Sequence, residues 1–388
     1  MKVGFSVSYN ALFIGDDVYP LRIAGDVLQT YWIIKYLRKN FDIEFGGLSP
    51  KNDINHLFFF FLSFFSSELD FSIGFNPNFY NFLYYNIYNS SSLFVRLFSG
   101  NSVFRRVFLF FDTLKFIKKN RIFIYNFKEK FLKKGRIKYI IVNSETEKRE
   151  FLNFLSLLNL DVGNIDFYVI YNPIDYEEID YLMNNSSYLD FKDFRRIYGI
   201  PESYALFIGR FDRIKNINNF VVEYKKKKIN KEFPLVILGS DQEYDQQYYN
   251  TLTEISNNGV ILINVNRLNV SYNGKDRYFF LRKLSLEFIK NSLFVVLPSL
   301  VESFGFVGLE AMYMNKPLVI TKNSPYGEIF HEYVGKSIKL IDPLNLNLSL
   351  NLFSFDKYIF MNEYVRNNFG IDKIAYKYLE VWKKYAGN

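Results

Sequence analysis

The chain contains no cysteine, only two histidines, and no run of about 18 apolar residues that is free of charge. Without cysteine, disulfides, thiolate metal sites and a cysteine nucleophile are excluded. The densest apolar stretch, residues 57–65, is too short to span a bilayer. The first residues also lack the charged, apolar and small-residue order of a signal peptide. We therefore expect a cytoplasmic protein, and peripheral attachment to a membrane stays open.

Length and apolar content indicate two domains. The 388 residues exceed one typical hydrophobic core, and 49% of them are hydrophobic, which is enough to fill a core in each of two domains. Apolar strands alternate with longer amphipathic segments, as in parallel α/β folds. In such sheets ligands bind beyond the carboxyl ends of the strands. The loops that follow the strands are therefore the first place to look for a site.

The predicted strands divide into two series. A helix start is predicted after the strand at 139–143, because Ser144 can cap a first turn that carries two acids. Asn172-Pro173 is predicted to be the connection between domains. A last amphipathic helix is predicted from Ile371 to Tyr385. The strands are predicted at 3–8, 71–74, 139–143 and 167–171 in the first series, and at 205–208, 235–238, 262–265, 293–297 and 318–321 in the second.

The net charge of +8 is concentrated in one segment. Between Arg105 and Lys138 there are twelve Lys and Arg residues, two acids and many aromatic residues. Such a segment can lie on an anionic membrane or against phosphate groups. The simpler reading is a solvated helix face beside a core stripe, and both readings stay open.

The sharpest pattern runs from Pro298 to Met312 and reads PSLVESFGFVGLEAM. It follows a buried strand and opens a helix, so its free backbone N–H groups form a natural anion site. Gly305 allows the backbone to approach a ligand closely. The carboxylates of Glu302 and Glu310 can accept hydrogen bonds from the paired hydroxyls of a sugar. The competing reading is an ordinary helix with a surface acid.

A second pattern, FIGRFDRIK at 207–215, places an arginine and a lysine directly after a strand and a glycine. The planar fork of Arg210 and the compact charge of Lys215 suit a diphosphate. Both would stabilise negative charge that grows on a leaving group. The alternative is two solvated bases in a loop. A weaker third pattern is the Ala24-Gly25-Asp26 helix start near the N-terminus.

These patterns together resemble family 4 of the retaining glycosyltransferases, whose E-x7-E motif matches Glu302 and Glu310. The resemblance implies the GT-B fold, in which two doubly wound Rossmann-like domains face a central cleft and a C-terminal helix crosses back to the first domain. It implies that Glu302 contacts the donor sugar, and that Arg210 and Lys215 stabilise the departing diphosphate. The implied donor-binding residues are Gly25, Gly209, Gly239, Ser303, Phe304, Gly305, Phe306 and Glu310, of which Glu310 would hold the ribose hydroxyls.

The resemblance covers the second domain well and the first only loosely. It implies an acceptor-binding domain at 1–172, a nucleotide-sugar-binding domain at 173–370, and a helix at 371–388 that packs on the first domain. Many family members place a histidine in the first domain near the reacting sugar. This chain has only His56 and His331, both of which we interpret as structural. Asn76 is better placed for that corner.

The predicted function is transfer of a sugar, with retention, from a nucleotide sugar such as a UDP- or GDP-sugar to a glycan, lipid-linked or other hydroxyl acceptor. No metal and no other cofactor are expected, because there is no paired-acid motif at a strand end and Asp16-Asp17 lies in an early loop. The alternatives are a catalytically silent GT-B module that binds nucleotide or membrane, and a nucleic-acid binder, which lacks any recognisable reading motif.

Overall fold

The computed structural model describes the chain in ranges separated by gaps, and it divides into two compact units. Unit 1 consists of Met1–Pro173 and Ile371–Asn388, and unit 2 is the continuous segment Ile174–Gly370. The chain therefore passes between the units twice. The described residues are 1–6, 11–14, 17–20, 25–46, 48–57, 73–75, 118, 121–122, 124–185, 187–241, 246–268, 274–300, 302, 304–355 and 361–386.

Unit 1 is built on a parallel sheet in the order β4-β1-β5-β6-β7-β8, with a separate antiparallel pair, β2 and β3. Its strands are β1 (Lys2–Ser6), β2 (Ala11–Ile14), β3 (Asp17–Pro20), β4 (Glu44–Gly46), β5 (Ile54–Leu57), β6 (Ile73–Phe75), β7 (Ile137–Val142) and β8 (Asp166–Val169). Its helices include α1 (Gly25–Asn40), the π-helix η3 (Phe127–Leu132), α5 (Glu145–Leu157) and α14 (Ile371–Tyr385).

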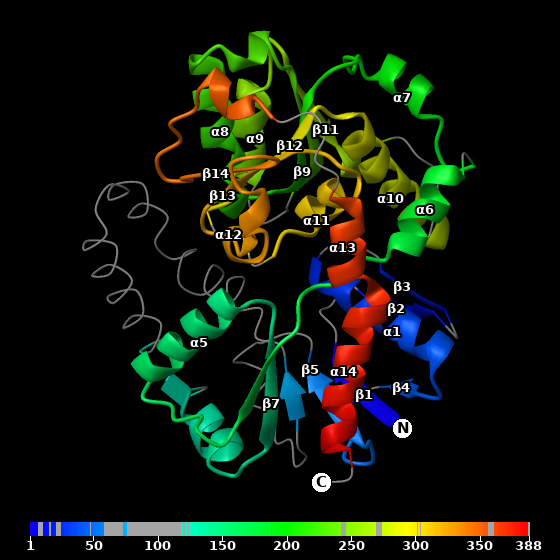
Figure 1. Ribbon diagram of the computed structural model, residues 1–388, viewed down its shortest axis with the longest axis vertical. Coiled ribbons are helices and arrows are strands. Elements are labelled where there is room, and N and C mark those ends of the chain that lie inside the picture. The colour runs from blue at the N-terminus through cyan, green and yellow to red at the C-terminus, as the bar shows by residue number, and fades with distance from the viewer. Residues whose placement is uncertain are drawn as a thin grey trace. The chain divides into compact units, whose positions relative to one another are not determined.

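Two local predictions in unit 1 are confirmed. Ser144 caps α5, and its side chain accepts a hydrogen bond from the backbone N–H of Glu147. The last helix, α14, has the predicted bounds and packs against α1 (Figure 1). The side chains of Tyr378 and Trp382 on α14 are fully buried. The ring of Trp382 lies 6.1 Å from Phe45, centroid to centroid.

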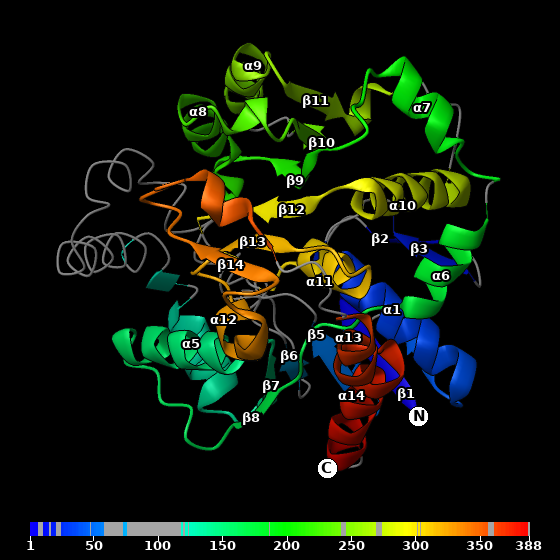
Figure 2. The same ribbon diagram turned by 45° about the horizontal axis from the view of Figure 1, so that its top comes forward.

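Unit 2 is a second parallel sheet, in the order β11-β10-β9-β12-β13-β14, and Figure 2 shows β9, β12, β13 and β14 side by side. The strands are β9 (Ala205–Phe211), β10 (Leu235–Asp241), β11 (Val260–Asn264), β12 (Phe294–Leu297), β13 (Leu318–Thr321) and β14 (Ile338–Ile341). The helices include α6 (Tyr176–Asn184), α7 (Phe191–Ile197), α8 (Ile217–Lys226), α9 (Gln246–Ile255), α10 (Gly274–Asn291), α11 (Phe306–Tyr313), α12 (Tyr326–Ile329) and α13 (Asn362–Phe369). Single 3-10 turns are η4 (Arg213–Lys215), η5 (Ile229–Lys231), η7 (Val265–Arg267), η8 (His331–Tyr333) and η9 (Leu350–Phe353).

The strand order of unit 2 locates its ligand-binding edge. In chain order the sheet reads 3-2-1-4-5-6, so the chain turns to one side after β9 and to the other side after β12. Open α/β sheets bind ligands at such a switch point, beyond the carboxyl ends of the two strands. The fold therefore directs attention to the segments that follow β9 and β12.

The predicted parallel α/β architecture is confirmed, and the strands that were predicted differ from prediction at their ends. β9 and β10 each run three residues further than predicted. The short strands β2, β3, β4, β5 and β14 were not predicted, because runs of three or four residues carry little periodicity. Among the described residues, no helix is both long and apolar enough to cross a membrane.

Gly239 marks a place where two strands leave no room for a side chain. It pairs with Gly209 across β10 and β9, and a Cβ atom added to it would lie 1.8 Å from the carbonyl oxygen of Gly209. We expect Gly239→Ala to lower the free energy of unfolding by about 3 kcal/mol, because backbone atoms of a central strand would have to move. The measurement is the midpoint of chemical denaturation.

The matched control is Gly46→Ala in β4, where an added Cβ atom would meet nothing within 4 Å. That change is expected to alter the free energy of unfolding by no more than about 0.5 kcal/mol. Equal stability of the two variants would contradict the close approach at Gly239.

Candidate functional site

The end of β9 presents two cations to the edge of the sheet. Arg210 lies near the end of the strand, and its Nη2 atom is 3.2 Å from Oδ2 of Asp212. The other carboxylate oxygen of Asp212 accepts a hydrogen bond from the backbone N–H of Lys215 at 3.3 Å and so caps the turn η4. The side chains of Arg210 and Lys215 keep 34% and 21% of their surface exposed. Both therefore remain within reach of an anion.

The segments that follow β9 and β12 are fastened together by hydrogen bonds. Asn216 has a φ angle of 54°, and its buried side chain donates to the carbonyl oxygens of Pro298 at 3.2 Å and Pro343 at 2.8 Å. The backbone N–H of Leu300 donates to the carbonyl oxygen of Ile214 at 2.7 Å. These bonds fix the position of η4 relative to the end of β12.

Glu302 and Lys215 meet at the place that these segments define. Nζ of Lys215 lies 2.7 Å from Oε2 of Glu302, and the hydroxyl of Ser299 donates to the same oxygen at 3.1 Å. The backbone N–H of Glu302 donates to the carbonyl oxygen of Asn323, beyond β13. Glu302 is only 7% exposed, and Ser299 is fully buried. Two of the predicted catalytic side chains are thus in direct contact.

Gly305 begins α11 beside Glu302. Its φ angle of +81° favours glycine, and a Cβ atom added there would lie 3.2 Å from Cγ of Glu302. Its carbonyl oxygen accepts hydrogen bonds from the backbone N–H of Gly308 and, at 2.8 Å, from the buried hydroxyl of Tyr326. The carbonyl of Gly305 and the N–H of Phe306 belong to one trans peptide unit and point in opposite directions. Tyr326 therefore also sets the direction of the N–H of Phe306 at the helix start.

Glu310, the second glutamate of the motif, lies further along α11 and is 2% exposed. Its Oε1 atom is 2.7 Å from Nη1 of Arg282 on α10. Burial raises the pKa of Glu310, and the charge of Arg282 opposes that rise. Sequence reasoning did not find Arg282, because nothing local to α10 shows which carboxylate it meets.

The other predicted donor-binding residues are distributed as follows. Phe304 is fully buried against Tyr326 and Phe369, so only its backbone can meet a ligand. Gly209 and Gly239 pair with each other at the ends of β9 and β10. Gly25 is the first residue of α1, in unit 1. Ser303 lies outside the described residues.

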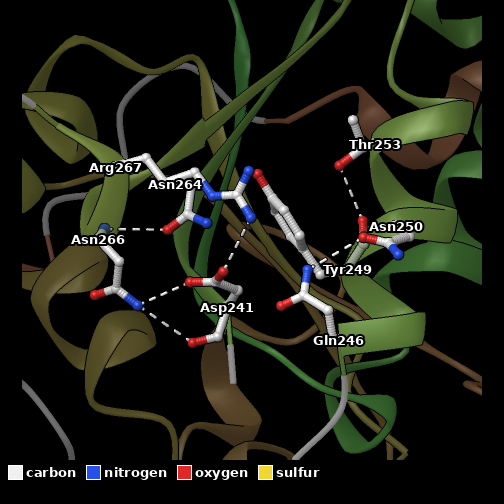
Figure 3. A network of polar contacts seen from close by, with 8 residues as sticks. All are labelled: Asp241, Gln246, Tyr249, Asn250, Thr253, Asn264, Asn266 and Arg267. Carbon is white, nitrogen blue, oxygen red and sulfur yellow. Dashed lines mark hydrogen bonds and ion pairs between the residues drawn. The ribbon is translucent and has the colours of Figure 1, made fainter. Parts of the chain in front are cut away.

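A polar network that sequence reasoning missed joins the ends of β10 and β11 (Figure 3). The side chain of Asn266 donates to Oδ1 of Asp241 at 2.8 Å, and Arg267 lies 3.4 Å from Oδ2. The guanidinium of Arg267 also lies 4.5 Å from the centre of the Tyr249 ring. Burial raises the pKa of Asp241, but these donors outweigh it, and the pKa lies below its ordinary value. The network holds the exposed guanidinium of Arg267 over the buried ring of Tyr249.

His56 is fully buried in unit 1, and its ring stacks on Tyr139 with Nδ1 3.1 Å from the tyrosine hydroxyl. His331 lies in the 3-10 turn η8 and is exposed. Asn76 and residues 105–117, 119–120 and 123 of the basic segment lie outside the described residues. In the described parts of the chain, no group of three or more acidic or histidine side chains could hold a metal ion. Membrane contact and metal independence stay predictions.

Residues 190–345 match the family model described as "Glycosyl transferases group 1". The matched segment contains β9 to β14 and every site residue of unit 2 discussed above. A search of curated protein sequences gave no match.

Solved structures share the fold over the whole chain. Anabaena HepE in complex with UDP and glucose has 13% identity and a TM-score of 0.58, with 99% of this chain and 100% of that chain covered. A glycosyltransferase from Rickettsia africae has 14% identity and a TM-score of 0.56, with coverages of 100% and 98%. AviGT4, a glycosyltransferase involved in avilamycin A biosynthesis, has 12% identity and a TM-score of 0.53, with the same coverages. At this level of identity, the likeness establishes the GT-B fold.

The hydrogen bond from Tyr326 to Gly305 gives a direct test of the anion site. We expect Tyr326→Phe to weaken the binding of inorganic pyrophosphate by about fivefold, because the N–H of Phe306 loses its fixed direction and part of its polarisation. The free energy of unfolding should fall by about 1 kcal/mol. Calorimetric titration and chemical denaturation measure the two effects.

Tyr224→Phe is the matched control. Tyr224 is also fully buried, and its hydroxyl donates to the carbonyl oxygen of Phe233 at 2.8 Å, away from α11. It should lose similar stability and keep the wild-type affinity for pyrophosphate. If both variants bind pyrophosphate equally well, Tyr326 does not orient the site.

Proposed function

We propose that this protein transfers a sugar from a nucleotide-sugar donor, bound by unit 2, to a hydroxyl acceptor, because residues 190–345 match the family model of the glycosyl transferases group 1 and the chain has the GT-B fold. The enzyme retains the configuration of the transferred sugar. We propose that the acceptor is a glycan or a lipid-linked sugar bound by unit 1.

The observation that carries this proposal is the meeting of Lys215 and Glu302 at the switch point of the unit 2 sheet. Arg210 lies at the end of the neighbouring strand β9, and Gly305 adjoins Glu302. Two cations, the start of a helix and a carboxylate lie along one edge of the sheet. Together they can bind the two chemically different parts of a sugar nucleotide. The cations and helix amides suit its diphosphate, and the carboxylate suits its hydroxyl groups.

The mechanism follows from where charge develops. As the bond from the anomeric carbon to the diphosphate breaks, negative charge grows on the leaving phosphate and positive charge grows on the sugar ring. Arg210, Lys215 and the amide of Phe306 stabilise the first. Glu302 holds a sugar hydroxyl and lies on the side of the developing positive charge. The acceptor oxygen bonds to the anomeric carbon on the same face, and its proton passes to the leaving phosphate oxygen.

Donor binding exchanges partners within the site. Lys215 and Glu302 neutralise each other in the protein, as do Arg210 and Asp212. A diphosphate that takes Lys215 leaves the nearly buried Glu302 in need of a hydrogen-bond donor. The hydroxyl groups of the donor sugar supply it. We propose a uridine diphosphate sugar as the first donor to test, because HepE was solved with UDP and glucose.

Variants of the three charged residues test the proposal. We expect Arg210→Ala, Lys215→Ala and Glu302→Ala each to lower kcat/KM for release of nucleotide from the donor by about 100-fold or more, because each removes a group that meets developing charge. Donor hydrolysis in the absence of an acceptor is sufficient for the measurement.

Lys231→Ala, which removes an exposed lysine of η5 in the same unit, serves as the control and should keep wild-type turnover. Unchanged turnover in the Arg210 and Glu302 variants would overturn the site assignment. Folding of every variant is checked by its melting temperature.

A further inference from the structure

The carboxylate of Glu310 has two oxygens in different surroundings. Oε1 forms the ion pair with Arg282 at 2.7 Å. Within the described residues, no hydrogen bond reaches Oε2. The side chain as a whole is 3% exposed, and of its two oxygens Oε1 is the one that is fully enclosed. A carboxylate oxygen in such poorly hydrated surroundings is stabilised when a ligand hydroxyl donates a hydrogen bond to it.

Arg282 is itself held from the opposite side. Its Nε atom lies 3.4 Å from Oε1 of Glu178 on α6, and the hydroxyl of Tyr278 donates to that same oxygen at 2.7 Å. All four residues are nearly inaccessible, with whole-residue exposures of 1% for Arg282, 2% for Glu310, 3% for Tyr278 and 4% for Glu178. Side chains from α6, α10 and α11 thus form one buried network.

Such a network is a poor way to stabilise a fold. In many proteins the free energy lost when charges leave water exceeds the free energy gained from their attraction. Apolar residues of the same volume often stabilise the fold more than a buried ion pair does. Here one guanidinium faces two carboxylates, so the ionised network carries a net negative charge. Burial raises the pKa of Glu310, and Glu178 contributes to the rise. A hydrogen-bond donor on a ligand would stabilise this negative charge when it reaches Glu310.

We propose that Arg282 is a positioning residue for nucleotide recognition: it holds Oε1 of Glu310 so that Oε2 accepts hydrogen bonds from the adjacent hydroxyls of the donor's ribose, while Glu178 and Tyr278 hold Arg282. This inference rests on the proposed function. The network orients Glu310 from the side away from the proposed ligand, because Arg282, Tyr278 and Glu178 lie on α10 and α6 and not in the loops at the ends of β9 and β12. Ribose recognition therefore depends on a residue of α10 that does not itself touch the nucleotide.

The experiment compares ribose with deoxyribose. UDP and GDP are titrated into the protein by calorimetry, and the tighter of the two is then compared with its 2′-deoxy and 3′-deoxy analogues. We expect Arg282→Met to weaken binding of the ribonucleotide about tenfold and to leave binding of the deoxy analogues within about twofold of wild type, because only the ribonucleotide uses Oε2 fully. Arg282→Lys should restore part of the preference.

Further variants keep the test informative if Arg282→Met does not fold. Tyr278→Phe removes one hydrogen bond from the network and should reduce the ribose preference by a smaller factor, about threefold. Its matched control is Tyr204→Phe, since the hydroxyl of Tyr204 donates to the carbonyl oxygen of Phe288 on the same helix, α10, at 2.9 Å. Glu310→Gln should abolish the preference for ribonucleotide over deoxynucleotide. Adding Arg282→Met to Glu310→Gln should have no further effect on that preference.

The outcomes separate the two proposals. If wild-type protein binds neither UDP nor GDP, the proposed function fails and this inference fails with it. If wild-type protein binds a nucleotide but the Arg282 and Tyr278 variants weaken ribonucleotide and deoxynucleotide equally, only the positioning role is overturned. A selective loss of the ribose preference supports it.

Discussion

Lys215 and Glu302 are 87 residues apart in the sequence, yet their charged atoms lie 2.7 Å apart at the edge of the unit 2 sheet. A parallel sheet makes this possible because the carboxyl ends of its strands lie along one edge. β9 and β12 are neighbours, so the segments that leave them start close together. Asn216 then fastens one segment to the other through Pro298. The strand order of the sheet therefore brings the two residues of the ion pair together.

This arrangement limits what can bind. Each cation at the edge already has a carboxylate partner, Lys215 with Glu302 and Arg210 with Asp212. A simple anion that binds Lys215 would replace the attraction between Lys215 and Glu302 with one between Lys215 and the anion. Glu302 would then be nearly buried without a partner, which is unfavourable. A ligand with phosphates and hydroxyls in one molecule satisfies both sides of the exchange. We therefore expect the site to bind a sugar phosphate more tightly than a simple phosphate or pyrophosphate, because of this ion pair.

Local parts of this structure were predictable from the sequence, and long-range pairings were not. The cap at Ser144 and the bounds of α14 follow from short-range signals. The strand, turn and helix around Gly305 were predictable because an unbroken apolar strand is followed by a turn with glycine and then by an apolar helical segment. The partners of the charged residues were different: Arg282 lies in an amphipathic helix whose sequence is compatible with many neighbours. Only the packing of α6, α10 and α11 brings it to Glu310 and Glu178.

The two units differ in how the chain completes them. Unit 2 is one continuous segment, whereas unit 1 requires α14 from the end of the chain. The buried rings of Tyr378 and Trp382 on α14 lie 5.9 and 5.7 Å from the ring of His56 in β5. At the end of the same helix, Lys384 lies 2.8 Å from Asp166 in β8. Without α14 these apolar faces of unit 1 would be exposed to water. Unit 2 is formed by one continuous segment, whereas the core of unit 1 is incomplete without α14.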